Sequence, residues 1–279
     1  MLSPEKSPAP TQRRTDKLTS EASPMNIVVC CKSVPGLVTD LKIGDDAKSL
    51  NYQGQLLAIN ECDEYALEEA LVLKKTHGGT ITAISMGSIK SQDVLYYALA
   101  KGADKAVRVD CETQDPQVAS KVLAAALKKL EYDLVLTGTQ ARDTLGGQVG
   151  ITAANLLDLP FAYAVVGVEV KDPRTIVARK ELGGGRNADV ELQLPALLCI
   201  QTGIQPLTFV PPARRVRARQ QPVKSFTMAD LEISADQLAP KGYRILAVKP
   251  PERAHQVELI QGNPLDVADA LLSKIRENR

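Results

Sequence analysis

The stretch Gly138-Thr139-Gln140-Ala141-Arg142-Asp143-Thr144-Leu145-Gly146-Gly147-Gln148-Val149-Gly150 decides the fold prediction. It follows an apolar run at 133–137, which is typical of a buried parallel strand, and precedes residues 151–157, whose apolar side chains have helical spacing. A glycine-rich loop between a strand and a helix lets backbone N–H groups approach an anion. The loop has neither the Lys-Ser/Thr pair of a P-loop nor the G-x-G-x-x-G spacing. From the loop alone, a phosphate-binding loop and an ordinary strand–helix turn both stay open.

Strands and helices alternate around this loop, which predicts an α/β fold with a Rossmann-like parallel sheet. The expected strands are 26–31, 80–85, 105–109 and 133–137. The expected helices are 61–76, 91–100, 117–130 and 151–157, and a long loop runs from residue 32 to Asn60. Ligands of such sheets bind at the carboxyl ends of the strands. The segments that would meet there are 30–32, 85–87, 108–110 and 137–148.

Beyond Pro160 the pattern changes to short strands at 164–170, 175–180, 189–193 and 196–201, which we expect to extend the sheet as antiparallel hairpins. Residues 203–224 are rich in proline and arginine, which is typical of a solvated connector. A last helix is expected over 265–275. The predicted organisation is a disordered tail (1–24), a nucleotide-binding α/β domain (25–202) and an extended C-terminal arm (203–279). The part of the arm after the connector has a polar first half, which we expect to lie over a partner.

Composition narrows the function classes. The 279 residues carry a net charge of +1 and no tryptophan, so neither charge nor stacking favours nucleic acid. The apolar runs are shorter than the ~20 residues of a transmembrane segment. Two histidines and five cysteines without C-x-x-C spacing argue against a zinc site or a disulfide framework and favour a reducing compartment.

The first 24 residues leave two interpretations of the location open. Arg13, Arg14 and Lys17 are compatible with a mitochondrial presequence. The acidic residues Glu5, Asp16 and Glu21 are unusual in one. We therefore expect a cytoplasmic protein, with the mitochondrial matrix as the alternative.

Four segments between residues 25 and 150 carry motifs that occur in this order in one family. They are the opening strand and lysine (25–35, MNIVVCCKSVP), a helix start (59–71, INECDEYALEEAL), Ser-Met-Gly at 85–87 with ALAKGAD at 98–104, and the loop 138–150. Together they resemble the beta subunit of electron transfer flavoproteins. The resemblance implies an adenine nucleotide α-hydrolase-like fold and a separate alpha subunit that holds the redox FAD. It also implies a second nucleotide in this chain, AMP in ordinary members and a second FAD in electron-bifurcating ones.

The resemblance also implies the site residues. Cys30 and Lys32 would lie beside the adenine and ribose, Asn60, Asp63, Ser85 and Met86 would line the same pocket, and the loop would surround the phosphate. The loop residues carried over are Gly138, Thr139, Gln140, Ala141, Arg142, Asp143, Thr144, Gly146, Gly147, Gln148 and Val149. By themselves, Cys30 is also compatible with a small core residue, and Asn60 with Asp63 is compatible with a plain helix N-cap. Leu231 would be the anchor of a recognition loop, 228–234, that enters a pocket of the partner dehydrogenase.

The function implied is that of an electron carrier subunit, not of a self-sufficient enzyme. It would pass electrons from flavin dehydrogenases of the acyl-CoA dehydrogenase type, in fatty acid oxidation, to a quinone reductase or a similar acceptor. One alternative is an electron-bifurcating beta subunit, because Val34-Pro35 after the lysine resembles the sequence of the bifurcating group more than that of ordinary members. Another is a nucleotide-binding regulatory module of the universal-stress-protein kind, for which a shorter chain would be expected.

Overall fold

The computed structural model describes residues 24–36, 42–51, 54–239, 244–250 and 258–277. They form two compact units, the second of which contains residues 42–51 and the described residues from 245 onward. Most of the predicted tail, 1–23, lies outside the described residues. The predicted domain boundary at residue 202 lies inside the first unit.

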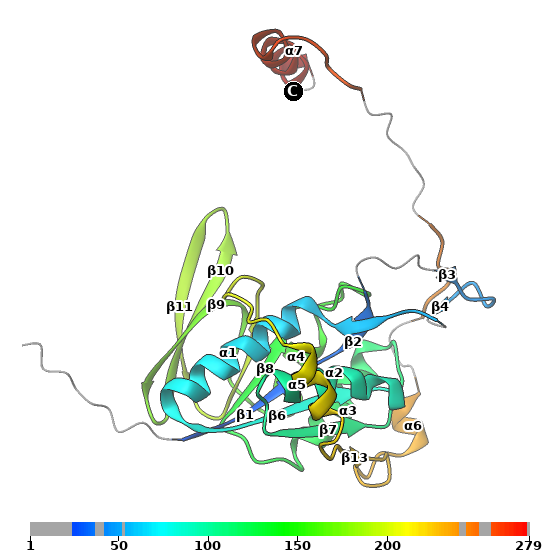
Figure 1. Ribbon diagram of the computed structural model, residues 1–279, viewed down its shortest axis with the longest axis vertical. Helices are drawn as coiled ribbons and strands as arrows, with labels where there is room; N and C mark the ends of the chain where they lie inside the picture. Colours follow the sequence, from blue (N-terminus) through cyan, green and yellow to red (C-terminus); the bar gives the residue numbers. More distant parts are fainter. Residues whose placement is uncertain (1–23, 37–41, 52–53, 240–243, 251–257, 278–279) are drawn as a thin grey trace, which may run out of the picture. The chain divides into compact units, whose positions relative to one another are not determined.

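A nine-stranded sheet forms the centre of the first unit (Figure 1). Its strand order is β11-β10-β9-β12-β8-β1-β6-β7-β13. In this order, every pair of neighbours from β9 across to β13 is parallel. The predicted α/β class with a parallel sheet is confirmed. The strands are β1 (Met25–Cys30), β6 (Gly79–Met86), β7 (Lys105–Val109), β8 (Leu134–Gly138), β9 (Phe161–Asp172), β10 (Thr175–Gly183), β11 (Arg186–Gln193), β12 (Ala196–Ile200) and β13 (Lys224–Phe226).

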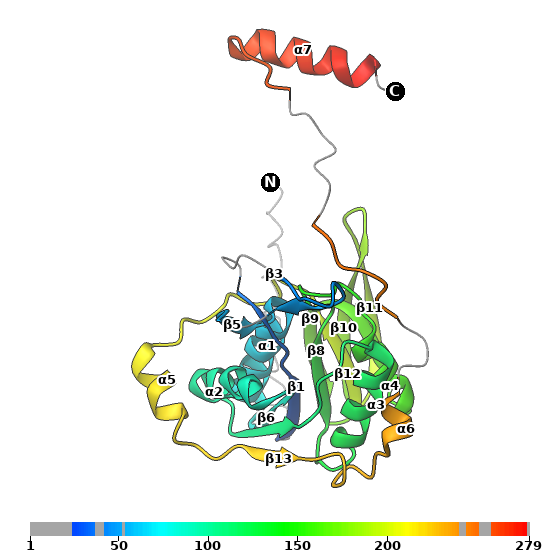
Figure 2. The same cartoon turned by 90° about the vertical axis from the view of Figure 1, so that its right-hand side faces the viewer.

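Helices cover both faces of this sheet (Figure 2). Alternate residues of β1 serve the two faces: Ile27 and Val29 pack in one apolar cluster and Val28 in the other, as the two-residue period of a strand requires. The first face carries α1 (Glu61–His77), α2 (Gln92–Lys101) and α5 (Pro212–Ala218), and the second carries α3 (Pro116–Leu127) and α4 (Val149–Leu156). The short 3₁₀ helix η1 (Ile89–Ser91) directly precedes α2.

The added strands agree with the prediction in part. β9, β10 and β11 pair as antiparallel neighbours, as expected. β12 instead runs parallel to both β8 and β9, which corrects the hairpin predicted for 196–201. All five of its residues are buried, and a continuous apolar run is typical of a central parallel strand covered on both faces.

The segment 32–60, predicted as a loop without strands, contains two pairs of short strands. Of these, β2 (Ser33–Pro35) pairs with β5 (Leu57–Ile59). In the second unit, β3 (Lys42–Ile43) pairs with β4 (Leu50–Asn51). Strands of two or three residues are too short to show a period, so the sequence pattern could not reveal them.

The proline- and arginine-rich segment packs on the chain's own sheet. β13 pairs with β7 at the sheet edge, and α5 lies against α2. Val210 and Ala218 are fully buried. The arginines of this segment are exposed, as expected of a solvated connector, but α5 also packs against the chain's own α2. The prediction that the following part of the arm lies over a partner stays a prediction. The short helix α6 (Ala235–Leu238) follows, and α7 (Pro264–Glu277) in the second unit matches the expected final helix.

Candidate functional site

The candidate site lies at the point where the strand order reverses. β1 is followed in the chain by β6 on one side, whereas β8 lies on its other side. Crevices at the carboxyl ends of such strands are the usual ligand sites of open α/β sheets. Cys30 ends β1, Ser85 and Met86 end β6, and Gly138 ends β8. The strand ends predicted to meet therefore do meet at one edge.

Asp63 joins three elements at this edge. Its carboxylate accepts hydrogen bonds from the backbone N–H groups of Lys32, after β1, and Gly138, in β8, with N–O distances of 2.7 and 2.9 Å. A Cβ atom at Gly138 would lie 2.3 Å from Asp63 Oδ1, so only glycine fits there. Burial raises the pKa of Asp63 to about 6, although the hydrogen bonds act in the opposite direction.

Asn60 has a related role but is no ordinary N-cap. It precedes α1, yet its side chain makes no capping hydrogen bond. Instead Nδ2 donates to the Gln140 carbonyl at 2.8 Å, and Oδ1 accepts from the Arg142 backbone N–H at 3.0 Å. Asn60 and Asp63 therefore use their side chains to fix the loop 138–150 against the start of α1.

The middle of the loop is held by charged side chains. Lys32 Nζ lies 2.8 Å from Asp143 Oδ1, and the Asp143 side chain is only 10% exposed. The Arg142 guanidinium donates to the Pro35 carbonyl. The Ala141 carbonyl accepts a hydrogen bond from the backbone N–H of Leu145, which closes a turn. Leu145 has a positive φ of 52° and an exposed side chain.

The end of the loop leads into α4 without a side-chain cap. Gln148 occupies the N-cap position and makes no capping hydrogen bond. Gly147 has a φ of +59°, and a Cβ atom there would lie 2.9 Å from the Tyr163 hydroxyl. Gly150 packs against Thr137 and Cys199 so closely that no side chain fits. The first turn of α4 thus presents N–H groups that suit an anion.

Two hydroxyl groups at this edge are buried and have no hydrogen-bond partner among the described residues. They are Oγ of Ser85, in β6, and Oγ of Ser33, in β2. Buried polar groups are normally paired, and each exception requires an explanation. A polar ligand at the switch point would supply the missing partners. Sequence reasoning missed Ser33 because the expected contact segment stopped at Lys32, one residue earlier.

The nearby thiols are neutral. Burial raises the pKa of Cys30 far above its ordinary value and that of Cys199 to about 11, with nearby carboxylate charge acting in the same direction. All five cysteines are free. A neutral thiol is a poor nucleophile, so Cys30 is suited to packing against a ligand and not to covalent chemistry.

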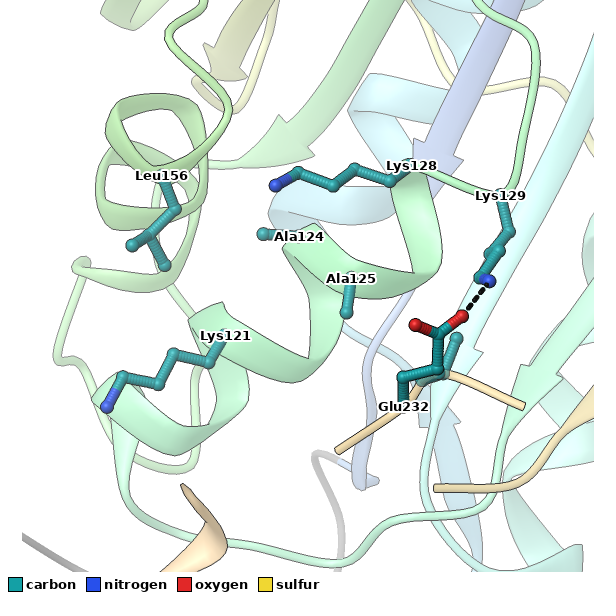
Figure 3. Close-up of a pocket in the computed structure, with 8 residues that line it drawn as sticks. Lys121, Ala124, Ala125, Lys128, Lys129, Leu156 and Glu232 are labelled. Atoms are coloured by element: carbon teal, nitrogen blue, oxygen red, sulfur yellow. Dashed lines mark hydrogen bonds and ion pairs between the residues drawn. The ribbon is translucent and has the colours of Figure 1, made fainter. Parts of the chain in front are cut away.

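Leu231 lies on the same face of the sheet as Cys199, in the apolar cluster against which Cys30 also packs. It is only 5% exposed and belongs to the apolar cluster of α3 and α4. It also lines a groove with Lys121, Ala124, Ala125, Lys128, Lys129, Leu156 and Glu232 (Figure 3). The groove is bordered by an ion pair between Lys129 and Glu232, with an N–O distance of 2.9 Å. The anchor role of Leu231 stays a prediction.

The fold and the site define an α/β protein with a parallel sheet whose strand ends meet at a switch point. Residues 50–231 match the family model described as "Electron transfer flavoprotein domain". The chain is 32% identical over 256 residues to the electron transfer flavoprotein subunit beta of Bacillus subtilis (strain 168), with 90% of this chain and 98% of the relative covered.

Two further relatives extend the comparison. The subunit beta of Clostridium acetobutylicum is 34% identical, and the caffeyl-CoA reductase-Etf complex subunit CarD of Acetobacterium woodii is 30% identical. Both alignments cover 91% of this chain and 98% of the relative. The chain belongs to the family of electron transfer flavoprotein beta subunits. Its role is in electron transfer, as the resemblance implies. No helix among the described residues is both long and apolar enough to cross a membrane.

Proposed function

We propose that the switch-point site of this beta subunit binds an adenine nucleotide, AMP, whose phosphate lies at the loop 138–149. Two observations carry the proposal: the buried hydroxyls of Ser33 and Ser85 have no hydrogen-bond partner among the described residues, and the N-terminus of α4 has no side-chain cap. These groups fit a ligand that offers both an anion and several hydrogen-bonding atoms. Lys32 adds a cation at the same edge, where its side chain is 42% exposed.

The structure supports different roles for the residues of the site. Backbone N–H groups from Gly146 to Val149 would hold the phosphate, and Cys30 and Met86 would contact the base and ribose. Asn60 and Asp63 already use their oxygens to accept backbone N–H groups. We therefore propose that these two side chains position the loop and do not bind the nucleotide directly.

We further propose that the chain acts as one half of a heterodimer with an alpha subunit. FAD bound with that subunit supplies the electron-carrying chemistry, and the AMP of the beta site would have no redox role. The donors would be flavin dehydrogenases of the acyl-CoA dehydrogenase type, and the acceptor a quinone reductase. The proposed location is the cytoplasm, or alternatively the mitochondrial matrix, because five free cysteines suit a reducing compartment.

Two apolar residues compete for the role of dehydrogenase anchor. Leu231, proposed from the resemblance, would have to leave its buried position to reach a partner. Phe209 is 76% exposed, and its neighbour Thr208 is fixed by hydrogen bonds from its N–H and hydroxyl groups to Glu68. An exposed aromatic side chain next to a fixed backbone segment suits a protein contact.

The nucleotide proposal is tested by the contents of the purified protein. The chain is expressed alone and together with its alpha subunit, and the nucleotides released by acid are separated by chromatography. We expect one AMP per chain in both preparations and one FAD only in the complex. Two FAD molecules and no AMP in the complex would replace this proposal with the electron-bifurcating one. A complex with FAD but no second nucleotide would refute the nucleotide site.

A further inference from the structure

Arg108 is a buried cation that the proposed nucleotide site does not explain. Its side chain, in β7, is 10% exposed. Nη1 donates to the Gly87 carbonyl at 2.9 Å and to Asp110 Oδ1 at 2.7 Å, and Nη2 donates to Ser225 Oγ at 3.0 Å. Nε is buried and has no hydrogen-bond partner among the described residues. One guanidinium group thus contacts three separate places in the chain.

The strand register explains why these groups meet. Ser85 of β6 is the paired neighbour of Arg108, and Arg108 is in turn the paired neighbour of Ser225 in β13. Paired residues of adjacent strands project from the same face of the sheet. The three side chains therefore form a row that crosses from the nucleotide edge to the outermost strand.

The two ends of this row, Ser85 and Ser225, belong to the nucleotide edge and to the arm. Gly87 follows Met86 directly, and its N–H donates to the Val109 carbonyl at 3.0 Å, so the turn after β6 is tied to β7. At the other end, β13 is a three-residue edge strand whose sheet partner is β7. It leads directly into residues 227–234, which contain the proposed recognition loop.

We propose that Arg108 is a positioning residue that couples the attachment of β13 to the nucleotide site through the turn 85–87. The inference rests on the proposed AMP site. Because the guanidinium fork has a fixed geometry, Arg108 reaches Gly87 and Ser225 together only when both segments occupy their places. Nucleotide binding and the attachment of β13 then strengthen each other, and such a coupling is reciprocal. Asp110 keeps the buried charge paired in either case.

The test uses hydrogen exchange of the complex with its alpha subunit, with and without added AMP. In the wild type, AMP is expected to slow exchange of the 224–226 amides about fivefold or more, the lower range of typical coupling. Arg108→Lys keeps the charge beside Asp110 but loses the fork, so AMP should no longer protect β13, and AMP should dissociate faster. Ser225→Ala, which removes only the bond to β13, should also reduce the protection and serves where Arg108→Lys does not fold.

Arg219→Gln is the matched control. Arg219 also ties the arm to the sheet side, through Asp93 at 2.9 Å, but does not contact the turn after β6. It should leave the AMP-dependent protection of β13 unchanged. Protection that persists in Arg108→Lys, or that is lost equally in Arg219→Gln, would overturn the inference.

A complex that binds no AMP would refute the proposed nucleotide site without deciding the role of Arg108. In that case exchange is compared without ligand. The coupling predicts that Arg108→Lys accelerates exchange both at the Gly87 amide and at residues 224–226. Faster exchange at 224–226 alone would show a local attachment of β13 and would refute the coupling.

Discussion

Asp63 and Glu68 lie on α1, and each carboxylate holds a different part of the chain. Asp63, in the first turn, accepts two backbone N–H groups and fixes the loop 138–150. Glu68, one turn later, contacts Lys101 Nζ at 2.8 Å and accepts from Thr208. Both residues are nearly inaccessible to solvent, with exposed fractions of 6% and 5%.

The pKa values of the two carboxyl groups are nevertheless shifted in opposite directions. Burial raises the pKa of Asp63 to about 6, because its hydrogen bonds do not offset the desolvation of the charge. Burial also acts to raise the pKa of Glu68, but hydrogen bonds from Lys101 and Thr208 and the charge of Lys101 hold it below its usual value. The balance between desolvation and the hydrogen bonds and charges around each carboxylate therefore decides the direction of its pKa shift. The charged form of Asp63, which holds the loop, is thus disfavoured by burial. The charged form of Glu68, which holds the arm, is favoured by its partners.

Removing the Lys101 cation should have the largest effect on stability among the changes that test this difference. Lys101 is 1% exposed and contacts Glu64 at 3.1 Å as well as Glu68. Lys101→Met leaves two carboxylates without it, so the free energy of unfolding should fall by about 3–5 kcal/mol. Urea denaturation at pH 7 measures the loss. The control is Lys171→Met, which removes an exposed pair with Glu191 and should hardly change the transition. Equal stability of both variants would contradict the assigned role.

The titration of Asp63 sharpens the comparison. Its folded pKa of about 6 exceeds the ordinary 3.8, so the folded state binds the proton more tightly. The stabilisation by this carboxyl is therefore present at low pH and lost as pH rises through the interval, by up to about 3 kcal/mol. Asp63→Asn should remove this part of the pH dependence of the melting temperature. Asp189→Asn, an exposed control, should retain it. A decline between pH 4 and 6 that is the same in Asp63→Asn would contradict the shift.

Leu231 tests the arm side of the comparison. If it is the core residue that its burial indicates, Leu231→Ala should lower the free energy of unfolding by at least about 2 kcal/mol and leave dehydrogenase-linked flavin reduction nearly unchanged. Phe209→Ala should do the reverse, because its side chain is exposed and would contribute to docking if the proposed anchor role is correct. The melting temperature and the rate of flavin reduction are measured for both. Slow electron transfer in a fully stable Leu231→Ala variant would restore Leu231 as the anchor.

The sequence predicted the loop side of the molecule better than the arm side for physical reasons. Strand ends, the glycines and the helix start at Asn60 and Asp63 leave local patterns of period, spacing and residue type. The contact of Glu68 with Thr208 joins residues far apart in the chain, and β13 owes its place to backbone pairing with β7. Neither leaves a local pattern. The burial of Leu231 depends on the same long-range packing.

Gly147→Val should have the smallest effect on the fold and a specific one on the site. Its φ of +59° disfavours a β-branched residue, and the new Cβ would lie 2.9 Å from the Tyr163 hydroxyl, so the backbone of the loop must move. Loss of even one charge-assisted hydrogen bond, about 1.5–3 kcal/mol, weakens AMP binding more than tenfold. The frame made by Asn60 and Asp63 should survive, and calorimetry with added AMP measures the difference. Gly146→Ala is the control, because a Cβ atom at this position would meet nothing within 4 Å and the φ of Gly146 is not positive. Full AMP affinity in Gly147→Val would show that the phosphate lies elsewhere.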